Sequence, residues 1–251
     1  TYSGAQNYGA LLQAQALTDY VQLLGYECCL IINWPFDGRW FKPRKNVQDI
    51  VVSILKMKQG KKRIKRYEAY REEYLRFSDE VKDLTDVQNL NEVFDCFITG
   101  SDQVWNCNNG ADEVFFVGFA GDNKNTIAYA PSFGSASIPE QYKNDVIQYL
   151  KKIKHISVRE KSGAALVETL IGYKPVIVID PVFLKDVSEW QKIVAPVEIN
   201  EPYIFVYSTQ KSDRLNQAVK AFEKKKNIKI ISTHAIPGVH CTVRKDIGPL
   251  E

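Results

Sequence analysis

The chain contains few of the residues that hold metal-bound or disulfide-linked folds together. Its 251 residues include only three histidines and five cysteines. The histidines form no HxxxH or HxH pair and the cysteines no paired CxxC spacing, so we expect no metal site. An odd number of cysteines argues against a disulfide framework, and the thiols are expected to be free in a reducing cytoplasm. Cys28, Cys29 and Cys96 lie inside apolar runs, which predicts that they are buried.

Long apolar runs are absent as well. No stretch of about eighteen apolar residues occurs, so the sequence predicts no membrane-spanning helix. It also contains no internal repeat and no low-complexity tract. Charged residues make up 25% of the chain and apolar residues 45%, which is the composition of a soluble globular protein. A chain of this length holds one large domain or two ordinary ones.

Positive charge is concentrated in one segment. The net charge is only +3, but residues 56–76 contain nine lysines and arginines against three glutamates. A solvated helix face is one interpretation of this segment. The other is a platform for an anionic partner, such as a membrane surface, a lipid-linked glycan or a phosphorylated substrate. No nucleic-acid-binding module surrounds the segment, so nucleic acid is not an expected partner.

Four strand-like runs end in polar or glycine-rich residues. The runs at 94–99, 126–130, 155–158 and 176–179 are followed by Gly-Ser-Asp-Gln, Pro-Ser-Phe-Gly, Arg-Glu and Asp-Pro. Ligands of open parallel sheets bind in the crevice beyond the carboxyl ends of the strands. The polar residues after these runs are therefore predicted to share one cleft.

The beginning of the chain is organised as loop, helix and strand. Apolar residues spaced by four and three positions predict a helix over residues 10–24, with Gly25 as its C-terminal cap. A strand is predicted at 27–32. Because such a start normally follows a first strand, we expect an opening strand ahead of Thr1.

Alternating strands and helices predict an α/β fold. Helices are expected at 139–153 and from about 160 to 170, where Gly172 ends the second one. This order is typical of a Rossmann-like parallel sheet flanked by helices. We assign residues 1–195 to this first domain, with a charged helical insertion at about 47–78.

A second unit is predicted after a break near residues 195–202. It contains a strand at 203–207, a helix at 212–226 and a strand at 228–232. Two strands and one helix cannot enclose a core of their own. We therefore interpret residues 196–251 as the start of a second, incomplete Rossmann-like domain.

Five short motifs occur in order along the first 181 residues. They are Asn-Tyr-Gly-Ala (7–10), Gly-Ser-Asp-Gln-Val-Trp-Asn (100–106), Tyr-Ala-x-Ser-Phe-Gly (129–134), Ser-Val-Arg-Glu (157–160) and Asp-Pro (180–181). In these motifs the chain resembles the polysaccharide pyruvyltransferase family. The resemblance implies two facing Rossmann-like domains, a GT-B-like plan, and transfer of a pyruvyl group from phosphoenolpyruvate to sugar hydroxyls. The family's later Ser-Phe-His-Gly element has no match here.

Two residues are the candidates for catalysis. The guanidinium group of Arg159 could hold a phosphate or carboxylate through paired hydrogen bonds, and the alternative is a structural ion pair with Glu160 or Asp180. Asp102 is the candidate base or hydroxyl-orienting group, and the alternative is an Asx turn or a helix cap after the strand. Asp180 itself is interpreted as architectural, because it precedes a proline.

The other candidates would bind substrate. Residues at the start of the first helix suit an anion, the polar residues after the 94–99 strand suit sugar hydroxyls, and the loop at 132–134 could supply backbone donors. Trp105 could stack on a pyranose ring or plug the core. The full set is Asn7, Tyr8, Gly9, Ser101, Gln103, Trp105, Asn106, Ser132, Phe133, Gly134 and Glu160.

The expected function is pyruvyl transfer to a surface polysaccharide or its precursor, in the cytoplasm or at the inner face of the membrane. Phosphoenolpyruvate would be the donor substrate, and no cofactor is expected. The general acid is expected beyond residue 251, so the chain by itself is expected to be inactive. Two alternatives stay open: a GT-B-type glycosyltransferase that uses a nucleotide sugar, and a non-catalytic carbohydrate-binding protein.

Overall fold

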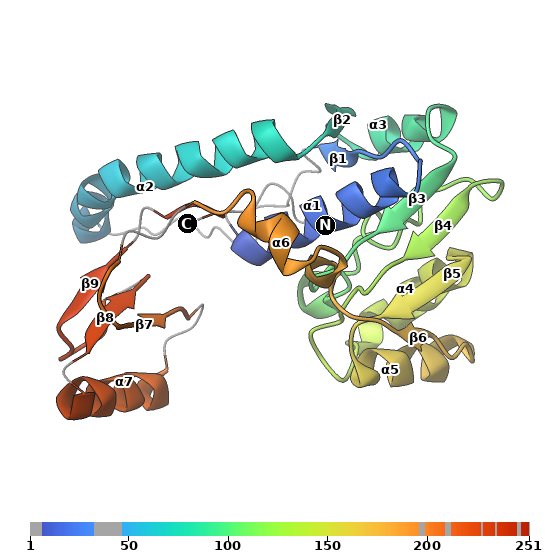
Figure 1. Cartoon of the computed structure of the whole chain (residues 1–251). Coiled ribbons are helices and arrows are strands. Elements are labelled where there is room, and N and C mark those ends of the chain that lie inside the picture. Colours follow the sequence, from blue (N-terminus) through green and yellow to red (C-terminus); the bar gives the residue numbers. More distant parts are fainter. Residues whose placement is uncertain are drawn as a thin grey trace. The chain divides into compact units, whose positions relative to one another are not determined.

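The computed structural model is an α/β structure whose parallel sheets are flanked by helices (Figure 1). It describes residues 7–32, 47–195, 199–208, 212–226, 228–233, 235–244 and 247–250. The chain forms two compact units. The first contains Thr1–Pro43 and Tyr70–Gln191, and the second contains Arg44–Ala69 and Lys192–Glu251. The domain boundary expected near residue 195 stays a prediction.

The first unit contains six strands in two parallel sheets. One sheet pairs β1 with β2, and the other has the order β3-β4-β5-β6. The strands are β1 (Leu30–Ile32), β2 (Phe77–Glu80), β3 (Cys96–Thr99), β4 (Asn125–Ala128), β5 (His155–Val158) and β6 (Val176–Ile177). Because β3 to β6 are all parallel, their carboxyl ends lie at one edge of the sheet.

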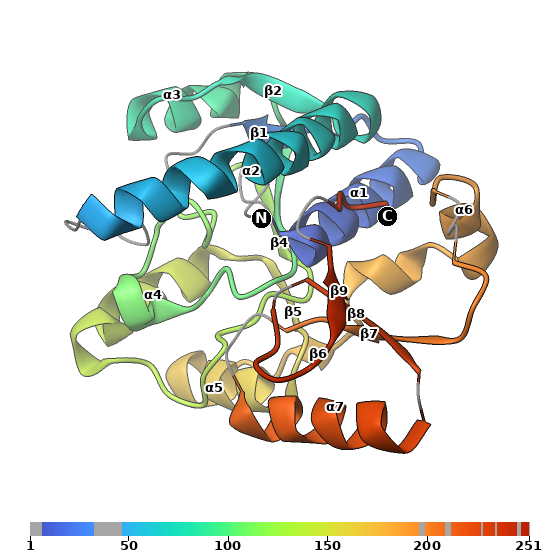
Figure 2. The ribbon, with the colours of Figure 1, turned by 90° about the vertical axis from the view of Figure 1, so that its left-hand side faces the viewer.

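Helices connect these strands. They are α1 (Tyr8–Leu23), α3 (Leu84–Asn89), α4 (Glu140–Lys152), α5 (Lys161–Ile171) and α6 (Val187–Gln191), with 3-10 turns η2 (Leu90–Glu92), η3 (Cys107–Asn109) and η4 (Pro181–Leu184). Helices α4 and α5 lie side by side in both views (Figures 1 and 2). The long α2 (Val47–Tyr74) contributes to both units.

Local signals explain where the predicted helices begin and end. The side chain of Asn7 caps α1 by accepting a hydrogen bond from the N–H of Ala10 at 3.3 Å. Gly25 follows α1 with a φ of +90°, and Gly172 caps α5 with a φ of +69°. Both angles lie in the left-handed region that glycine adopts without strain. The predicted helix ends at Gly25 and Gly172 are confirmed.

The second unit contains one strand more than predicted. Strands β7 (Tyr203–Val206), β8 (Lys229–Ser232) and β9 (Cys241–Val243) form a parallel sheet in that order, beside α7 (Asp213–Lys226). The prediction of two strands was wrong, because the three residues of β9 are too few to show an alternating pattern. The sheet and α7 share a small apolar core around Val206, Val219, Ile230 and Ile236.

The main core of the first unit fills the space between its sheet and helices. Phe97 of β3, Val146 and Leu150 of α4, and Val167 of α5 are at most 5% exposed. Val146 and Leu150 lie four positions apart and therefore share one face of α4. Among the described residues, no helix is long and apolar enough to cross a membrane.

The cysteines are free, as predicted, but not all of them are buried. Cys107 is only 4% exposed, whereas Cys28 and Cys29 are half-buried and Cys96 is exposed. The expectation of burial was therefore wrong for these three. Their apolar surroundings in the sequence suit interior strands, yet one side of those strands is open in the structure.

Burial of Cys107 predicts a loss of stability at high pH. Burial raises the pKa of this thiol from 9.0 to about 11. The folded state therefore holds the proton more tightly than the unfolded state. This contribution is fully present below pH 9 and is lost as the pH rises from 9 to 11, by about 2–3 kcal/mol. Urea unfolding between pH 8 and 11 should show a shallower loss for Cys107→Ala than for the wild type, and parallel curves would contradict the assignment.

Candidate functional site

Three strand ends bring Ser101, Arg159 and Asp180 into direct contact. Ser101 follows β3, Arg159 follows β5 and Asp180 follows β6. Nη1 of Arg159 donates to Oδ2 of Asp180 at 2.8 Å and to Oγ of Ser101 at 3.2 Å. The Ser101 hydroxyl donates in turn to the same Oδ2 at 2.7 Å. The three side chains form a closed triangle, which we call the strand-end cluster.

Arg159 also contacts the neighbouring carboxylate. Its Nε donates to Oε1 of Glu160 at 2.8 Å. Burial by itself would lower the pKa of Arg159, but the hydrogen bonds with Glu160 and Asp180 outweigh burial and raise that pKa. The side chain of Arg159 remains 27% exposed. No described residue accepts a hydrogen bond from its Nη2, so these N–H groups can bind an incoming anion.

The loops after β3, β4 and β5 are joined by backbone hydrogen bonds. The N–H of Ser132 donates to the carbonyl of Asp102 at 2.9 Å, and the N–H of Trp105 donates to the carbonyl of Ser132 at 3.2 Å. The N–H of Arg159 donates to the carbonyl of Pro131 at 3.4 Å. The expected neighbourhood of Asp102, Ser132 and Arg159 is therefore present at the level of the backbone.

Two residues of these loops have unusual backbone angles. Asp102 has a φ of +79° and Ala130 a φ of +53°, although neither is glycine. Such conformations cost free energy and occur preferentially at functional sites. Oδ1 of Asp102 accepts from the N–H of Gln103 at 2.8 Å, while no described residue donates to Oδ2. The bond is to the next residue rather than two residues on, so it is not the predicted Asx turn, and the second carboxylate oxygen of Asp102 remains available within the described part of the chain.

Gly134 brings the second and third sequence motifs together. It has a φ of +62°, and Nδ2 of Asn106 donates to Oε1 of Gln103 at 3.1 Å beside it. A Cβ at residue 134 would lie 2.6 Å from Oε1 of Gln103 and 2.9 Å from Nδ2 of Asn106. Only glycine leaves room for this pair of amides, which are the polar groups expected to contact sugar hydroxyls.

Gly134→Ala is expected to displace Gln103 and Asn106. The left-handed φ should cost about 1 kcal/mol of stability. The clash of the new Cβ with Gln103 and Asn106 should also lower kcat/KM for the acceptor, because both side-chain amides must move. Gly172→Ala is the matched control, since Gly172 has a similar φ of +69° and a Cβ there would meet no atom within 4 Å. Equal effects of the two substitutions on acceptor use would contradict a role for these amides.

Trp105 and Phe133 lie in the core rather than at the surface. Trp105 is fully buried and stacks on Phe116, with ring centroids 5.1 Å apart and an angle of 3° between the planes. Its Nε1 donates to the carbonyl of Phe115 at 3.1 Å, and Phe133 packs against the indole. Of the two expectations for Trp105, the structure therefore supports the position in the core. The indole is buried, so neither of its faces is available to a sugar ring.

The first motif is used to start α1. Asn7 serves as the helix cap, Tyr8 begins the helix and Gly9 is exposed. Gly100, which follows β3, packs against a later part of α1, because a Cβ at Gly100 would lie 3.1 Å from Cδ2 of Leu17. The structure therefore explains Asn7 as the residue that caps α1.

Asp180 forms the ion pair with Arg159 that was one alternative of the sequence analysis, in addition to the architectural role expected of it. Its position before a proline suggested an architectural role, and its Oδ1 does cap η4 by accepting from the N–H of Val182 at 3.1 Å. Its Oδ2 meanwhile binds both Arg159 and Ser101. Burial, followed by Tyr20 and Asp180, raises the pKa of Tyr129.

Within the described part of the chain, no group of three or more histidine, cysteine, aspartate or glutamate side chains could hold a metal ion. The strand-end cluster and the adjoining Glu160 together present one guanidinium group, two carboxylates and one hydroxyl.

Comparison with known proteins identifies the family. The family model of polysaccharide pyruvyl transferases matches residues 7–245, which is nearly the whole chain. Searches of curated proteins and of solved structures returned no match. The match begins at the asparagine that caps α1 and includes the ends of β3, β4, β5 and β6. This chain belongs to the polysaccharide pyruvyl transferase family.

Proposed function

We propose that the protein transfers a pyruvyl group from phosphoenolpyruvate to two hydroxyls of a surface polysaccharide or its precursor. The family match supports the reaction class. The observation that carries the assignment to this site is Arg159, which is held at the common edge of the strands with Nη2 still available. Phosphoenolpyruvate would be a substrate, and the proposal requires no cofactor.

The reaction needs a proton donor, an anion clamp and a base. Protonation of the methylene carbon of phosphoenolpyruvate gives an oxocarbenium-like centre, and the first sugar hydroxyl adds to that carbon and loses its proton to a base. Phosphate then leaves with the electrons of its C–O bond, and the second hydroxyl adds to the oxocarbenium-like carbon that this step regenerates and loses its proton in turn. Arg159 would hold the phosphate or carboxylate of the donor through Nη2. Asp102, with Oδ2 available, would accept a proton from the attacking hydroxyl or orient it.

Charge determines how an anion can enter. Arg159 faces both Glu160 and Asp180, so the three side chains together carry a net negative charge when both acids are ionised. A donor phosphate must therefore displace one carboxylate or bring in further cations. Glu160 is the side chain that would leave, because it is 38% exposed whereas Asp180 is 22% exposed and also holds Ser101. Displacement would leave Asp180 to position the guanidinium group.

At the level of architecture, we propose a Rossmann-like first domain and a GT-B-like arrangement of two such domains in the complete enzyme. The parallel strand order and the position of the cluster at the strand ends support the first part of this proposal.

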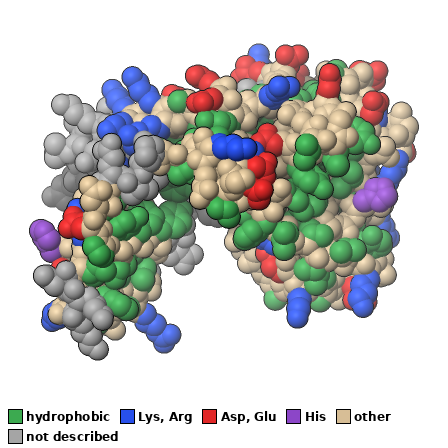
Figure 3. Space-filling model, in the orientation of Figure 1, with side chains coloured by type: hydrophobic (Ala, Val, Ile, Leu, Met, Phe, Trp, Pro, Cys, Tyr) green, Lys and Arg blue, Asp and Glu red, His purple; other side chains and the backbone are tan. Residues whose placement is uncertain are grey.

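We also propose that α2 brings the enzyme to an anionic surface, such as the inner face of a membrane or a lipid-linked glycan. Basic side chains gather over part of this helix (Figure 3). They include Lys61, Lys62, Lys65 and Arg66, of which the three lysines are exposed. Attraction of this kind contributes about 1 kcal/mol per basic residue near such a surface.

Ligand-dependent stabilisation tests the proposed donor. Phosphoenolpyruvate at about 100 times its Kd should stabilise the folded protein by about 2.7 kcal/mol and raise its Tm. UDP-glucose at the same concentration serves as the comparison. The proposal predicts a rise in Tm with phosphoenolpyruvate only, and release of phosphate when a glycan acceptor is added. Stabilisation by the nucleotide sugar alone would instead favour a glycosyltransferase.

A further inference from the structure

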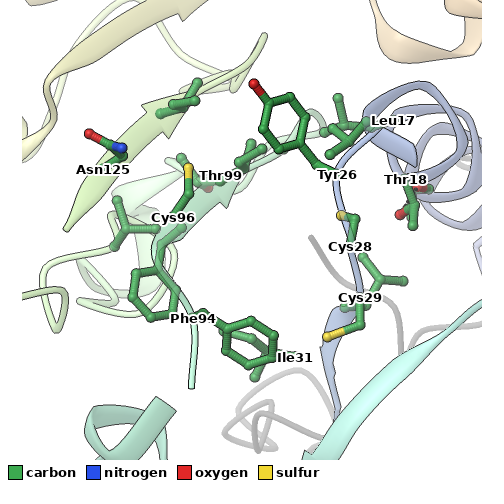
Figure 4. Close-up of a pocket in the computed structure, with 18 of the residues that line it drawn as sticks. Leu17, Thr18, Tyr26, Cys28, Cys29, Ile31, Phe94, Cys96, Thr99 and Asn125 are labelled. Atoms are coloured by element: carbon green, nitrogen blue, oxygen red, sulfur yellow. Dashed lines mark hydrogen bonds between the residues drawn. The ribbon is translucent and has the colours of Figure 1, made fainter. Parts of the chain in front are cut away.

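A pocket in the first unit is poorly suited to the carbohydrate acceptor. It has a volume of about 790 Å³ and lies between the residues that lead into β1 and those of β3 (Figure 4). Leu17, Ile31 and Phe94 line it together with cysteine side chains. Two polar residues of its lining, Asn125 and His155, stand at the starts of β4 and β5, whereas the strand-end cluster follows the strands. The acceptor sugar therefore needs a contact surface elsewhere.

An aromatic ring is a usual part of a sugar-binding surface, and Trp105 cannot provide it because it is buried. One face of a pyranose ring carries mostly C–H bonds, which pack on the electron-rich face of an aromatic ring. Among the described residues of the first unit, the exposed aromatic side chains are those of Tyr20, Tyr26, Tyr173 and Phe183. Phe183 is the most exposed of these, at 70%, and it follows three residues after Asp180 of the strand-end cluster.

An exposed phenylalanine by itself is common, but the backbone of Phe183 is held in a fixed position. Its N–H donates to the carbonyl of Asp180 at 3.1 Å within η4. The carbonyl of the preceding Val182 accepts a hydrogen bond from Nε1 of Trp190 at 3.1 Å, which joins η4 to α6. On its other side, η4 packs against α1. The exposed phenyl ring is therefore carried by a turn that is anchored to two helices.

The turn that carries the ring begins at the strand-end cluster itself. Asp180 caps η4 through Oδ1 and binds Arg159 and Ser101 through Oδ2. A 3-10 turn rises by about 2 Å per residue, so Phe183 lies about 6 Å from Asp180 along the axis of the turn. A pyranose ring on Phe183 would therefore adjoin the proposed donor site. Phenylalanine also has only two rotatable side-chain bonds, so that stacking costs little conformational entropy.

We propose that the phenyl ring of Phe183 stacks on a pyranose ring of the carbohydrate acceptor. The inference rests on the proposed function, because it takes the acceptor as the ligand. The competing explanation is a contact with another protein surface. Ile179 and Val187 lie four residues to either side of Phe183 and are 59% and 71% exposed. A protein partner would cover all three apolar side chains, whereas stacking on a sugar needs only the ring of Phe183.

Saturation-transfer NMR with three simple probes tests the contact directly. The probes are methyl β-glucoside, methyl β-galactoside and methyl β-mannoside. At least one of them should receive magnetisation at the C–H protons of one ring face, and Phe183→Ala should abolish this transfer. Val187→Ala is the matched control, because it shortens an equally exposed apolar side chain and should keep the transfer. Absence of transfer from the unmodified protein to all three probes, or equal loss in both variants, would overturn the proposal.

Kinetic measurements use the pyranoside that binds best as the acceptor. Phe183→Ala should raise KM for this acceptor about ten-fold and leave Tm and KM for phosphoenolpyruvate unchanged. Phe183→Trp should keep a low KM for the acceptor. Phe183→Leu should behave like the alanine variant, because leucine keeps the apolar surface and loses the flat face. Recovery with leucine would indicate a general apolar contact and contradict stacking.

The stacking contact and the proposed function can fail separately. If phosphoenolpyruvate neither stabilised the protein nor released phosphate, while a pyranoside still lost its contact in Phe183→Ala, the donor would be wrong and the stacking contact would stand. If phosphate release proceeded and Phe183→Ala and Val187→Ala gave equal KM values for the acceptor, only the stacking contact would be wrong.

Discussion

Arg159→Ala is expected to lower kcat/KM for phosphoenolpyruvate by about 10²–10³-fold, measured as phosphate release. The guanidinium group is the one cation in the strand-end cluster, and its Nη2 is the part that can reach the donor. Removal of Arg159 would also leave Glu160 and Asp180 facing each other without a counter-charge. Arg159→Lys should recover little of the activity, because an ammonium group cannot replace the planar fork.

Two further variants separate catalysis from folding. Lys143→Ala removes a cation from an exposed ion pair with Glu140 and should leave kcat/KM unchanged. Glu160→Gln removes the carboxylate that we expect an anion to displace, so it should lower KM for phosphoenolpyruvate. If Arg159→Ala retained full activity while binding the donor normally, our assignment of the clamp would be wrong.

Trp105→Ala is expected to destabilise the protein by about 3–5 kcal/mol, which is a large part of the stability of an ordinary domain. The indole is fully buried, stacks on Phe116 and donates to the carbonyl of Phe115. Alanine would leave a cavity and remove one of the two side-chain donors to the carbonyl of Phe115, which also accepts from Oγ1 of Thr99 at 2.7 Å. Trp105→Phe should cost less, because the ring contact survives and only the N–H is lost.

Urea unfolding measures this effect, and acceptor kinetics test the alternative. If Trp105 stacked on a sugar ring, alanine would raise KM for the acceptor and leave the free energy of unfolding almost unchanged. Because Trp105 lies at the end of the Gly-Ser-Asp-Gln-Val-Trp motif, its packing also holds the loop that carries Asp102. We therefore expect Trp105→Ala to lose stability and turnover together. A raised KM for the acceptor with an unchanged free energy of unfolding would contradict the assignment of Trp105 to the core.

Most helices and strands of the fold followed from local patterns. The apolar spacing predicted α1, the run at 155–158 coincides with β5, and Gly172 marked the end of α5. The elements that were missed are β2, α3, α6 and β9. Strand β2 has the sequence Phe-Ser-Asp-Glu, which no propensity favours, and it forms because it pairs with β1. Tertiary pairing thus outweighed local preference there.

The candidate site was only partly visible in the sequence. That polar residues follow the strands could be predicted, because the end of an apolar run is a local feature. The burial of Trp105 could not, since a tryptophan after a strand suits a sugar platform as well as a core. The proline after Asp180 suggested an architectural role, and an ion pair with Arg159 was only one of the alternatives; that one carboxylate oxygen binds both Arg159 and Ser101 could not be predicted.

The sequence by itself determined the α/β class, the family and the edge of the sheet at which polar side chains gather, because periodicity, caps and motifs are properties of neighbouring residues. Only the tertiary structure decided that Arg159 binds Asp180, 21 residues away, and Ser101, 58 residues away. The reason is physical. A hydrogen bond depends on a few tenths of an ångström between two atoms, and that distance is set by the order and register of strands that are remote in the chain.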